Sequence, residues 1–184
     1  MAVDLITKEE TIPRYYKTGV IILADGSLPL DYPSDKALMY LNLKNEYKYK
    51  HKTDFDKLKQ LEEEIKLWPR NEQNDPYYFR ILELLNQLRF TISYVIDVAF
   101  KDFCNPDLKT SLLNMISMKV QNILIIPVEF LHDPIEYVKK AIEETKADRY
   151  ANVQLLWPYD LSLQVDFITE HILRFIRKHH MFSY

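Results

Sequence analysis

The chain has 184 residues, a formal net charge of −3, one cysteine and two glycines, and 47% of its residues are hydrophobic. This charge argues against a general nucleic-acid binder, which usually carries a strongly basic face. One cysteine cannot form an intramolecular disulfide, the acidic N-terminus lacks the pattern of a signal peptide, and no apolar run reaches membrane-spanning length. We therefore expect a single soluble, cytoplasmic domain over residues 1–184, with neither nucleic acid nor a membrane as a partner.

The first predicted element is an apolar run between the two glycines, Gly19 and Gly26. A strand that is apolar on both faces is typical of the middle of a parallel sheet. In open α/β sheets, ligands bind beside the carboxyl ends of such strands. Asp25, Gly26 and Ser27 follow the strand directly, so we expect them to face a ligand. The alternative is that Asp25 and Gly26 form only a turn with a polar tip.

A helical region is predicted over residues 34–89, before the next strand. It opens at Ser34, a good capping residue, and a second helix has apolar residues at helical spacing from Phe55 to Ile65. A third helix opens at Asp75, which precedes a proline at the first helical position. Two or three helices are more than one crossover requires, so we interpret 34–89 as an enlarged helical insert after the first strand.

Strands and helices alternate over the rest of the chain. Further strands are predicted at 91–100, 120–127 and 153–157, which are rich in β-branched and apolar residues. Further helices are predicted from Asn105 to Met118, from Asp133 to about Lys146, and from Asp160 to Ile176. This alternation indicates right-handed βαβ units. We expect an α/β fold with a four-stranded parallel sheet in the order 2-1-3-4 and helices on both faces.

Two isolated glycines exclude the common nucleotide-binding loops. A Walker loop or a dinucleotide fingerprint needs several glycines in one turn, so that backbone amides can approach phosphates. Ser27 also lacks the spacing of a nucleophile elbow. Cys104 has no neighbour in sequence that would activate it as a nucleophile, so we expect it to serve in packing.

Four segments of the chain carry a family resemblance. They are Ile22–Pro29 (ILADGSLP), Val98–Leu108 (VAFKDFCNPDL), Ile125–Glu136 (IIPVEFLHDPIE) and Leu156–Leu161 (LWPYDL). In this order they resemble the class II tetrapyrrole chelatases, which insert cobalt or iron into sirohydrochlorin, and the related protoporphyrin ferrochelatases. The second segment is the most specific match, because it is similar to the pattern Ala-Phe-x-Glu-Phe-x-x-Pro-x-Leu of the sirohydrochlorin enzymes. The helical insert has no counterpart in this resemblance.

The resemblance also implies site residues. The metal-binding histidine of the family's first loop corresponds to Asp25, and the catalytic glutamate of the ferrochelatases corresponds to Glu136. The second histidine of the sirohydrochlorin enzymes corresponds to Ile135, but His132 lies one helical turn earlier and is an alternative ligand. Carboxylate and imidazole both suit first-row metal ions. We predict Asp25, His132 and Glu129 as metal ligands, Asp25 and Glu136 as catalytic residues, and Gly26, Ser27, Tyr32 and Phe100 as substrate-binding residues.

Most of these residues also have a simpler interpretation. Asp133 and Glu136 fit a capping box, in which Glu136 bonds back to the start of a helix. His132 is equally typical of an exposed loop, and Tyr32 and Phe100 are typical of a protein core. The two histidines at 179–180 follow basic residues, and cations there fit a helix end better than a metal site.

Three functions remain open at this stage. The first is an ATP-independent chelatase, a lyase that inserts Fe²⁺ or Co²⁺ into a sirohydrochlorin-like tetrapyrrole, with the metal as substrate and no permanently bound cofactor. The second is a chelatase-like protein that binds a tetrapyrrole, a metal or a partner protein without turnover. The third is an unrelated flavodoxin-like interaction domain. Because ferrochelatases resemble two such domains joined together, the resemblance implies a homodimer.

Overall fold

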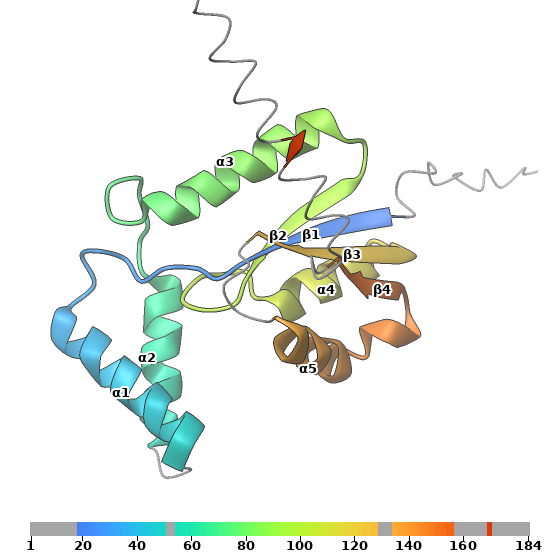
Figure 1. Ribbon diagram of the computed structural model, residues 1–184. Helices are drawn as coiled ribbons and strands as arrows, with labels where there is room; N and C mark the ends of the chain where they lie inside the picture. Colours follow the sequence, from blue (N-terminus) through green and yellow to red (C-terminus); the bar gives the residue numbers. More distant parts are fainter. Residues whose placement is uncertain (1–17, 51–53, 129–133, 157–168, 171–184) are drawn as a thin grey trace, which may run out of the picture.

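A four-stranded parallel sheet forms the centre of the protein (Figure 1). The structure is a computed structural model that describes residues 18–50, 54–128, 134–156 and 169–170. The strands are β1 (Thr18–Ala24), β2 (Val95–Phe100), β3 (Asn122–Pro127) and β4 (Asn152–Leu155), and their order is β2-β1-β3-β4. The predicted α/β class, strand order and parallel pairing are therefore confirmed.

The inner position of β1 explains its apolar sequence. β1 pairs with β2 on one side and with β3 on the other, so that Ile22 lies opposite both Val98 and Ile126. Every residue of β1 after Thr18 is buried. A strand with neighbours on both sides and helices on both faces has no position that tolerates a polar side chain.

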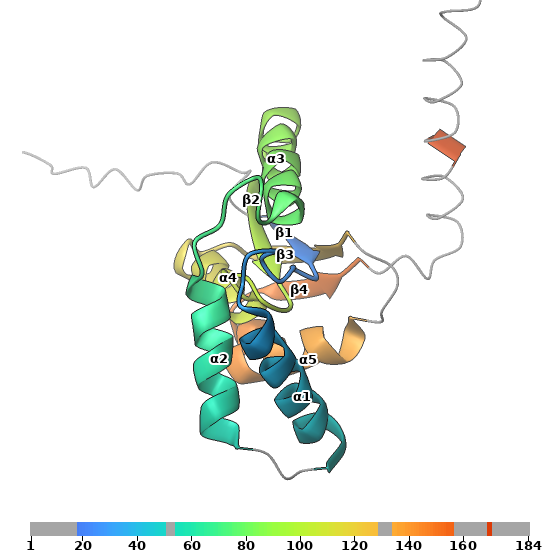
Figure 2. The same cartoon turned by 90° about the vertical axis from the view of Figure 1, so that its left-hand side faces the viewer.

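Helices cover the two faces of the sheet, and Figure 2 shows α3 on one side with α4 and α5 on the other. These helices are α3 (Pro76–Thr91), α4 (Leu108–Ser117) and α5 (Ile135–Thr145), and a short 3₁₀ helix, η2, spans Ala147–Arg149. Ile21 and Leu23 pack with α4 and α5, whereas Val20 and Ile22 pack with α3. In the described part of the chain, none of the helices has the length and apolar character needed to cross a membrane.

The remaining two helices form a hairpin that projects beyond the carboxyl end of β1 (Figure 1). They are α1 (Ser34–Lys50) and α2 (Phe55–Leu67). The hairpin has a small core of its own, which includes Tyr40, Leu61 and Ile65. The region 34–89 thus has two parts, because α3 makes the crossover from β1 to β2 and the hairpin is an addition to it.

Several predicted element boundaries are wrong, and the third strand begins at Asn122 rather than at residue 120 while the fourth ends at Leu155 rather than at residue 157. The second strand begins at Val95 rather than at Thr91, because the Ile92 amide donates to the Leu88 carbonyl at 2.9 Å and extends α3. The helix predicted from Asn105 begins only after Asp107, whose carboxylate accepts the Thr110 amide at 2.9 Å. The helix predicted over 160–176 lies outside the described residues, apart from 169–170.

β2 is an edge strand of the sheet, and side chains already form hydrogen bonds to several backbone groups on its outer side. Arg89 donates to the Ile96 carbonyl at 3.1 Å. The Asp97 carboxylate accepts the Val98 amide at 2.9 Å, and the Ser111 hydroxyl donates to the Val98 carbonyl at 2.7 Å. An edge strand normally exposes such groups to any passing strand.

Candidate functional site

The carboxyl end of β1 is a topological switch point of the sheet, because β2 lies on one side of β1 and β3 on the other. The connection after β1 carries α3 over one face, and the connection after β3 carries α5 over the other (Figure 2). Ligands of open α/β sheets usually bind in the crevice at such a point. Residues 25–29 follow β1 at this end of the sheet, the expected place of such a crevice, and the Val128 amide beyond β3 donates to the Leu23 carbonyl at 2.9 Å.

Asp25 is the first residue after β1, and its side chain is partly exposed, at 38%. Its backbone carbonyl accepts the Asp102 amide at 2.8 Å, so the loop after β2 holds it in place. The Asp25 carboxylate faces the Lys101 ammonium at 3.7 Å. The structure therefore presents one solvent-accessible carboxylate at the crevice, with a cation beside it.

Gly26 occupies a position where no other residue fits without strain. Its φ angle is +86°, in the region that side chains disfavour. A Cβ atom at this position would lie 2.1 Å from the Asp102 carbonyl oxygen and 3.3 Å from the Cys104 sulfur. The close approach of the loops after β1 and β2 therefore explains why position 26 is a glycine.

Cys104 is buried, and burial raises the pKa of its thiol, which argues against an activated nucleophile.

Ser27 is held by a buried ion pair from the connection between α2 and α3. Arg70 and Asp75 form this pair, and their side chains are 8% and 0% exposed. The Ser27 hydroxyl donates to Asp75, and Arg70 donates to the Ser27 carbonyl at 3.0 Å. Arg70 also donates to the Phe103 carbonyl at 2.5 Å, and Asp75 accepts the Tyr78 amide at 3.0 Å. This network joins α3 to the loops after both β1 and β2.

Sequence reasoning missed the network around Arg70. Asp75 was expected only as a helix cap, which it is, but the cap is also one half of a buried ion pair. Arg70 follows Trp68 and Pro69 and lies outside any periodic pattern, so no local signal marks it. Asp75 gives no further signal, because its role as the helix cap already accounts for an acid at this position.

Two of the predicted substrate-binding residues lie in cores. The Phe100 ring is fully buried and stacks on Tyr78 with the ring centroids 5.2 Å apart. Tyr32 is 5% exposed, and its ring meets Trp68 edge-on at a centroid distance of 5.0 Å. The Tyr32 hydroxyl is buried and has no hydrogen-bond partner among the residues that the structure describes. In this arrangement neither ring presents a face to the crevice, and contact with a substrate stays a prediction.

The remaining predicted residues follow β3. Glu136 lies in the first turn of α5, its side chain is 90% exposed, and its carboxylate lies 3.3 Å from the Lys139 ammonium. The residue at the N-cap of α5 is Pro134, whose side chain has no group that could accept a capping hydrogen bond. Glu129 and His132 fall outside the described residues. Within the described residues, no group of three or more His, Cys, Asp or Glu side chains is placed to hold a metal ion.

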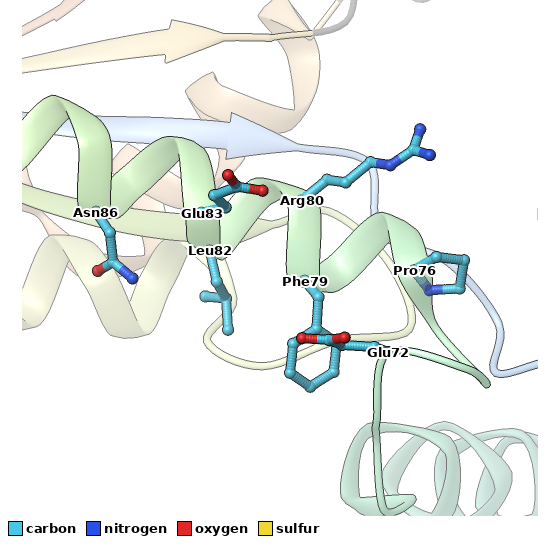
Figure 3. A pocket seen from close by; sticks show the side chains of 7 residues that line it. All are labelled: Glu72, Pro76, Phe79, Arg80, Leu82, Glu83 and Asn86. Carbon is cyan, nitrogen blue, oxygen red and sulfur yellow. The ribbon is translucent and has the colours of Figure 1, made fainter.

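A cavity of about 620 Å³ lies along α3, away from the crevice (Figure 3). Phe79, Leu82 and Asn86 point to one side of the helix in this view, whereas Arg80 points to the other. None of the predicted site residues lines it. The cavity therefore gives no support to the predicted site.

No protein-family model matches the sequence, and no curated protein matches it significantly. A match to a solved structure does exist, to a protein from Marinobacter aquaeolei VT8 described as a CbiX protein of cobalamin (vitamin B12) biosynthesis. The match has 14% sequence identity and a TM-score of 0.44, and it covers 85% of this chain and 98% of that chain. Because both values are low, the fold class rests on the strand order and pairing described above rather than on this likeness.

Proposed function

We propose that the protein is a class II-type chelatase that inserts Fe²⁺ or Co²⁺ into a sirohydrochlorin-like tetrapyrrole. The motif resemblance supports this proposal, because three of the four matching segments follow neighbouring strands β1, β2 and β3 on the same edge of the sheet. The observation that carries it is the position of Asp25. In the resemblance this residue corresponds to the family's metal-binding histidine, and its carboxylate is partly exposed at the carboxyl end of β1.

Insertion requires a group that holds the metal beside the macrocycle and a base that accepts the pyrrole protons. Asp25 is the proposed ligand, together with His132 and Glu129. A divalent cation on Asp25 would displace the Lys101 ammonium, now 3.7 Å from its carboxylate. The freed ammonium would suit a carboxylate side chain of the tetrapyrrole. Glu136 is the proposed proton acceptor, since it is on the first turn of α5 and open to solvent.

The test compares Asp25→Ala with Asp35→Ala, which removes an exposed acid at the start of α1. We expect Co²⁺ to stabilise the wild type by about 2.7 kcal/mol at a concentration one hundred times the dissociation constant. The Asp25→Ala variant should lose this gain, and the Asp35→Ala variant should keep it. Thermal unfolding with and without Co²⁺ measures the difference.

Activity is measured by the absorbance change of sirohydrochlorin with Fe²⁺ or Co²⁺ and no ATP. We expect weak insertion by the wild type, none by Asp25→Ala, and faster insertion by Asp25→His, which restores the family's ligand. If neither wild type nor Asp25→His inserts metal, and spectral titration detects no tetrapyrrole binding, the chelatase proposal is wrong.

The second candidate function is tetrapyrrole, metal or partner binding without turnover. The observation that favours it is the state of the first loop. Both the hydroxyl and the carbonyl of Ser27 are bonded to the Arg70–Asp75 pair, and Asp25 faces Lys101. A spectral titration that shows tetrapyrrole binding, combined with no insertion by wild type or Asp25→His, would favour this function.

A homodimer that closes the crevice is the proposed working unit, because the chain supplies one domain of the two that ferrochelatases resemble. The α1–α2 hairpin projects beyond the carboxyl edge of the sheet and is the proposed contact (Figure 1). Sedimentation velocity should detect a dimer at micromolar concentration. A monomer with and without tetrapyrrole would contradict this part of the proposal.

A further inference from the structure

A second cavity, of about 330 Å³, lies inside the α1–α2 hairpin. Its walls come from both helices and include Tyr40, Lys44, Tyr47, Phe55, Leu58 and Lys59. Tyr40, Lys44 and Tyr47 follow at intervals of four and three residues on α1, and Phe55 lies three and four residues before Leu58 and Lys59 on α2, so each set shares one face; Glu62 of α2 also lines the cavity. Asp102, from the loop after β2, also lines the cavity. Small-molecule sites typically begin at about 300 Å³, so this volume suits one or two fused rings.

The mouth of the cavity carries two exposed aromatic rings. Tyr47 is 52% exposed and Phe55 is 56% exposed, although both are large apolar groups. Their ring centroids are 5.9 Å apart, at an angle of 44°. Leu58 is buried and supplies an apolar contact below them. A flat ring inserted here would cover apolar surface that the folded chain leaves in water.

Among the charged residues at the cavity, one cation has no ion-pair partner in the described part of the chain. Lys44 holds the Asp102 carboxylate at 2.5 Å, and Lys66 holds the Glu62 carboxylate at 2.8 Å. Lys59 is exposed and has no ion pair among the described residues. The charges of the four charged residues that line the cavity, Lys44, Lys59, Glu62 and Asp102, sum to zero, but each of the two acids already has a cation beside it, so Lys59 is the lining cation that remains without an ion pair within the described ranges.

Lys44 is fixed as part of the wall rather than free to bind. Its ammonium lies 5.6 Å from the Tyr40 ring centroid and 5.4 Å from the Phe103 ring centroid. Burial lowers the pKa of Lys44, but the hydrogen bond and charge of Asp102 outweigh burial and leave this pKa above its usual value. Lys44 thus stays charged and committed to Asp102 at neutral pH, and Lys59 is the available partner for an anion.

We propose that this cavity binds a small, flat aromatic carboxylate, with the ring against Tyr47 and Phe55 and the carboxylate on Lys59. The site is separate from Asp25 and goes beyond the proposed chelatase function. A tetrapyrrole, with four linked rings, exceeds what 330 Å³ holds. The occupant is therefore a different molecule from the proposed substrate.

The test uses two probes of the same shape, 2-naphthoate and the uncharged 2-naphthamide. Titration of ¹⁵N-labelled protein should shift amide signals in α1, α2 and near Asp102, and naphthoate should bind more tightly. Lys59→Gln should weaken naphthoate binding about fivefold and leave naphthamide binding unchanged. Lys57→Gln, on the same helix but outside the cavity, is the matched control and should change neither. Phe55→Ala should weaken both probes.

Several results would overturn the proposal. Shifts centred elsewhere, equal affinity of the wild type for both probes, or equal naphthoate binding by Lys59→Gln and the wild type would each do so. Lys59 and Phe55 are exposed, so their variants should fold, and the amide spectra check this directly. Asp25→Ala should bind naphthoate normally, which separates this test from that of the chelatase function.

Discussion

The two parts of the 34–89 region differ in how they are held to the sheet. α3 lies flat on one face through Ile81 and Leu85, and the buried Arg70–Asp75 pair fixes its start. The α1–α2 hairpin packs mainly on itself, and its ion pairs Lys36–Glu64 and Lys44–Asp102 are partly exposed. The same stretch of sequence thus contains α3, which is part of the sheet's core, and the α1–α2 hairpin, which packs mainly outside that core.

Because of this difference, substitutions around α3 and substitutions in the hairpin should affect different properties of the protein. Burial of an ion pair makes each partner dependent on the other, because an unpaired charge in the core is costly. Partly exposed pairs contribute little, since water solvates either partner alone. We therefore expect changes around α3 to unfold the protein, and changes in the hairpin mainly to alter what it binds.

The largest expected effect is that of Asp75→Ala. This change leaves Arg70 without its carboxylate, Ser27 without its acceptor and α3 without its cap, and should cost about 3–5 kcal/mol of unfolding free energy. Asp54→Ala is the matched control, because Asp54 caps α2 through an exposed bond to the Lys57 amide at 3.0 Å. That loss should be about 1 kcal/mol. Urea unfolding measures both, and equal losses would contradict the comparison.

The next effect is that of Gly26→Ala, which should cost at least about 2 kcal/mol. The new Cβ would meet the Asp102 carbonyl, a backbone atom that cannot move without separating the two loops. Gly19→Ala makes a useful contrast, because its Cβ would lie 2.6 Å from the sulfur of the flexible Met115 side chain. We expect a loss of about 1 kcal/mol there. Urea unfolding should rank the two variants in this order.

Alkaline pH should destabilise the protein through both regions. Burial raises the pKa of Tyr40 in the hairpin and of Tyr137 below the sheet, so each ionises more readily in the unfolded chain. Their contribution is fully present below pH 10, their ordinary pKa, and is lost as pH rises through the folded-state values. Unfolding free energy should fall as the pH rises above 10. Tyr40→Phe and Tyr137→Phe should each reduce this fall.

The smallest effect is expected for Lys36→Ala at the base of the hairpin, in the first turn of α1. The Lys36 ammonium and the Glu64 carboxylate are 2.6 Å apart, but the side chains are 44% and 31% exposed. The variant should unfold at a urea concentration close to that of the wild type, and the difference should shrink further in high salt. A loss comparable to that of Asp75→Ala would show that the hairpin is as essential as α3.

The strand order was predictable because it follows from local patterns. The apolar run of β1 marks an inner strand, and the handedness of crossovers then leaves few arrangements. The start of β2 was not predictable in this way. Thr91 and Ile92 are β-branched and favour a strand, but α3 continues to Thr91, whose hydroxyl donates to the Gln87 carbonyl at 2.8 Å, and the Ile92 amide donates to the Leu88 carbonyl at its cap.

The candidate site was less predictable than the fold. The exposure of Asp25 beside β1 follows from the strand pattern, but its pairing with Lys101 depends on the register of β1 and β2. Tyr32 looked available in sequence, whereas the hairpin packs Trp68 against it. Contacts between side chains that are far apart in the sequence produce no periodic sequence pattern. These contacts nevertheless decide which groups remain accessible to a ligand.

The covered edge of β2 limits how copies of this protein can associate. Many parallel and antiparallel sheets join across subunits by pairing their edge strands, which continues one sheet through two chains. Here Arg89, Asp97 and Ser111 occupy backbone groups that a joining strand would need. An incoming strand would have to break these bonds before it gained any of its own. Assembly through β2 is therefore disfavoured, which leaves β4, the other edge strand, and the helical surfaces for contacts between copies.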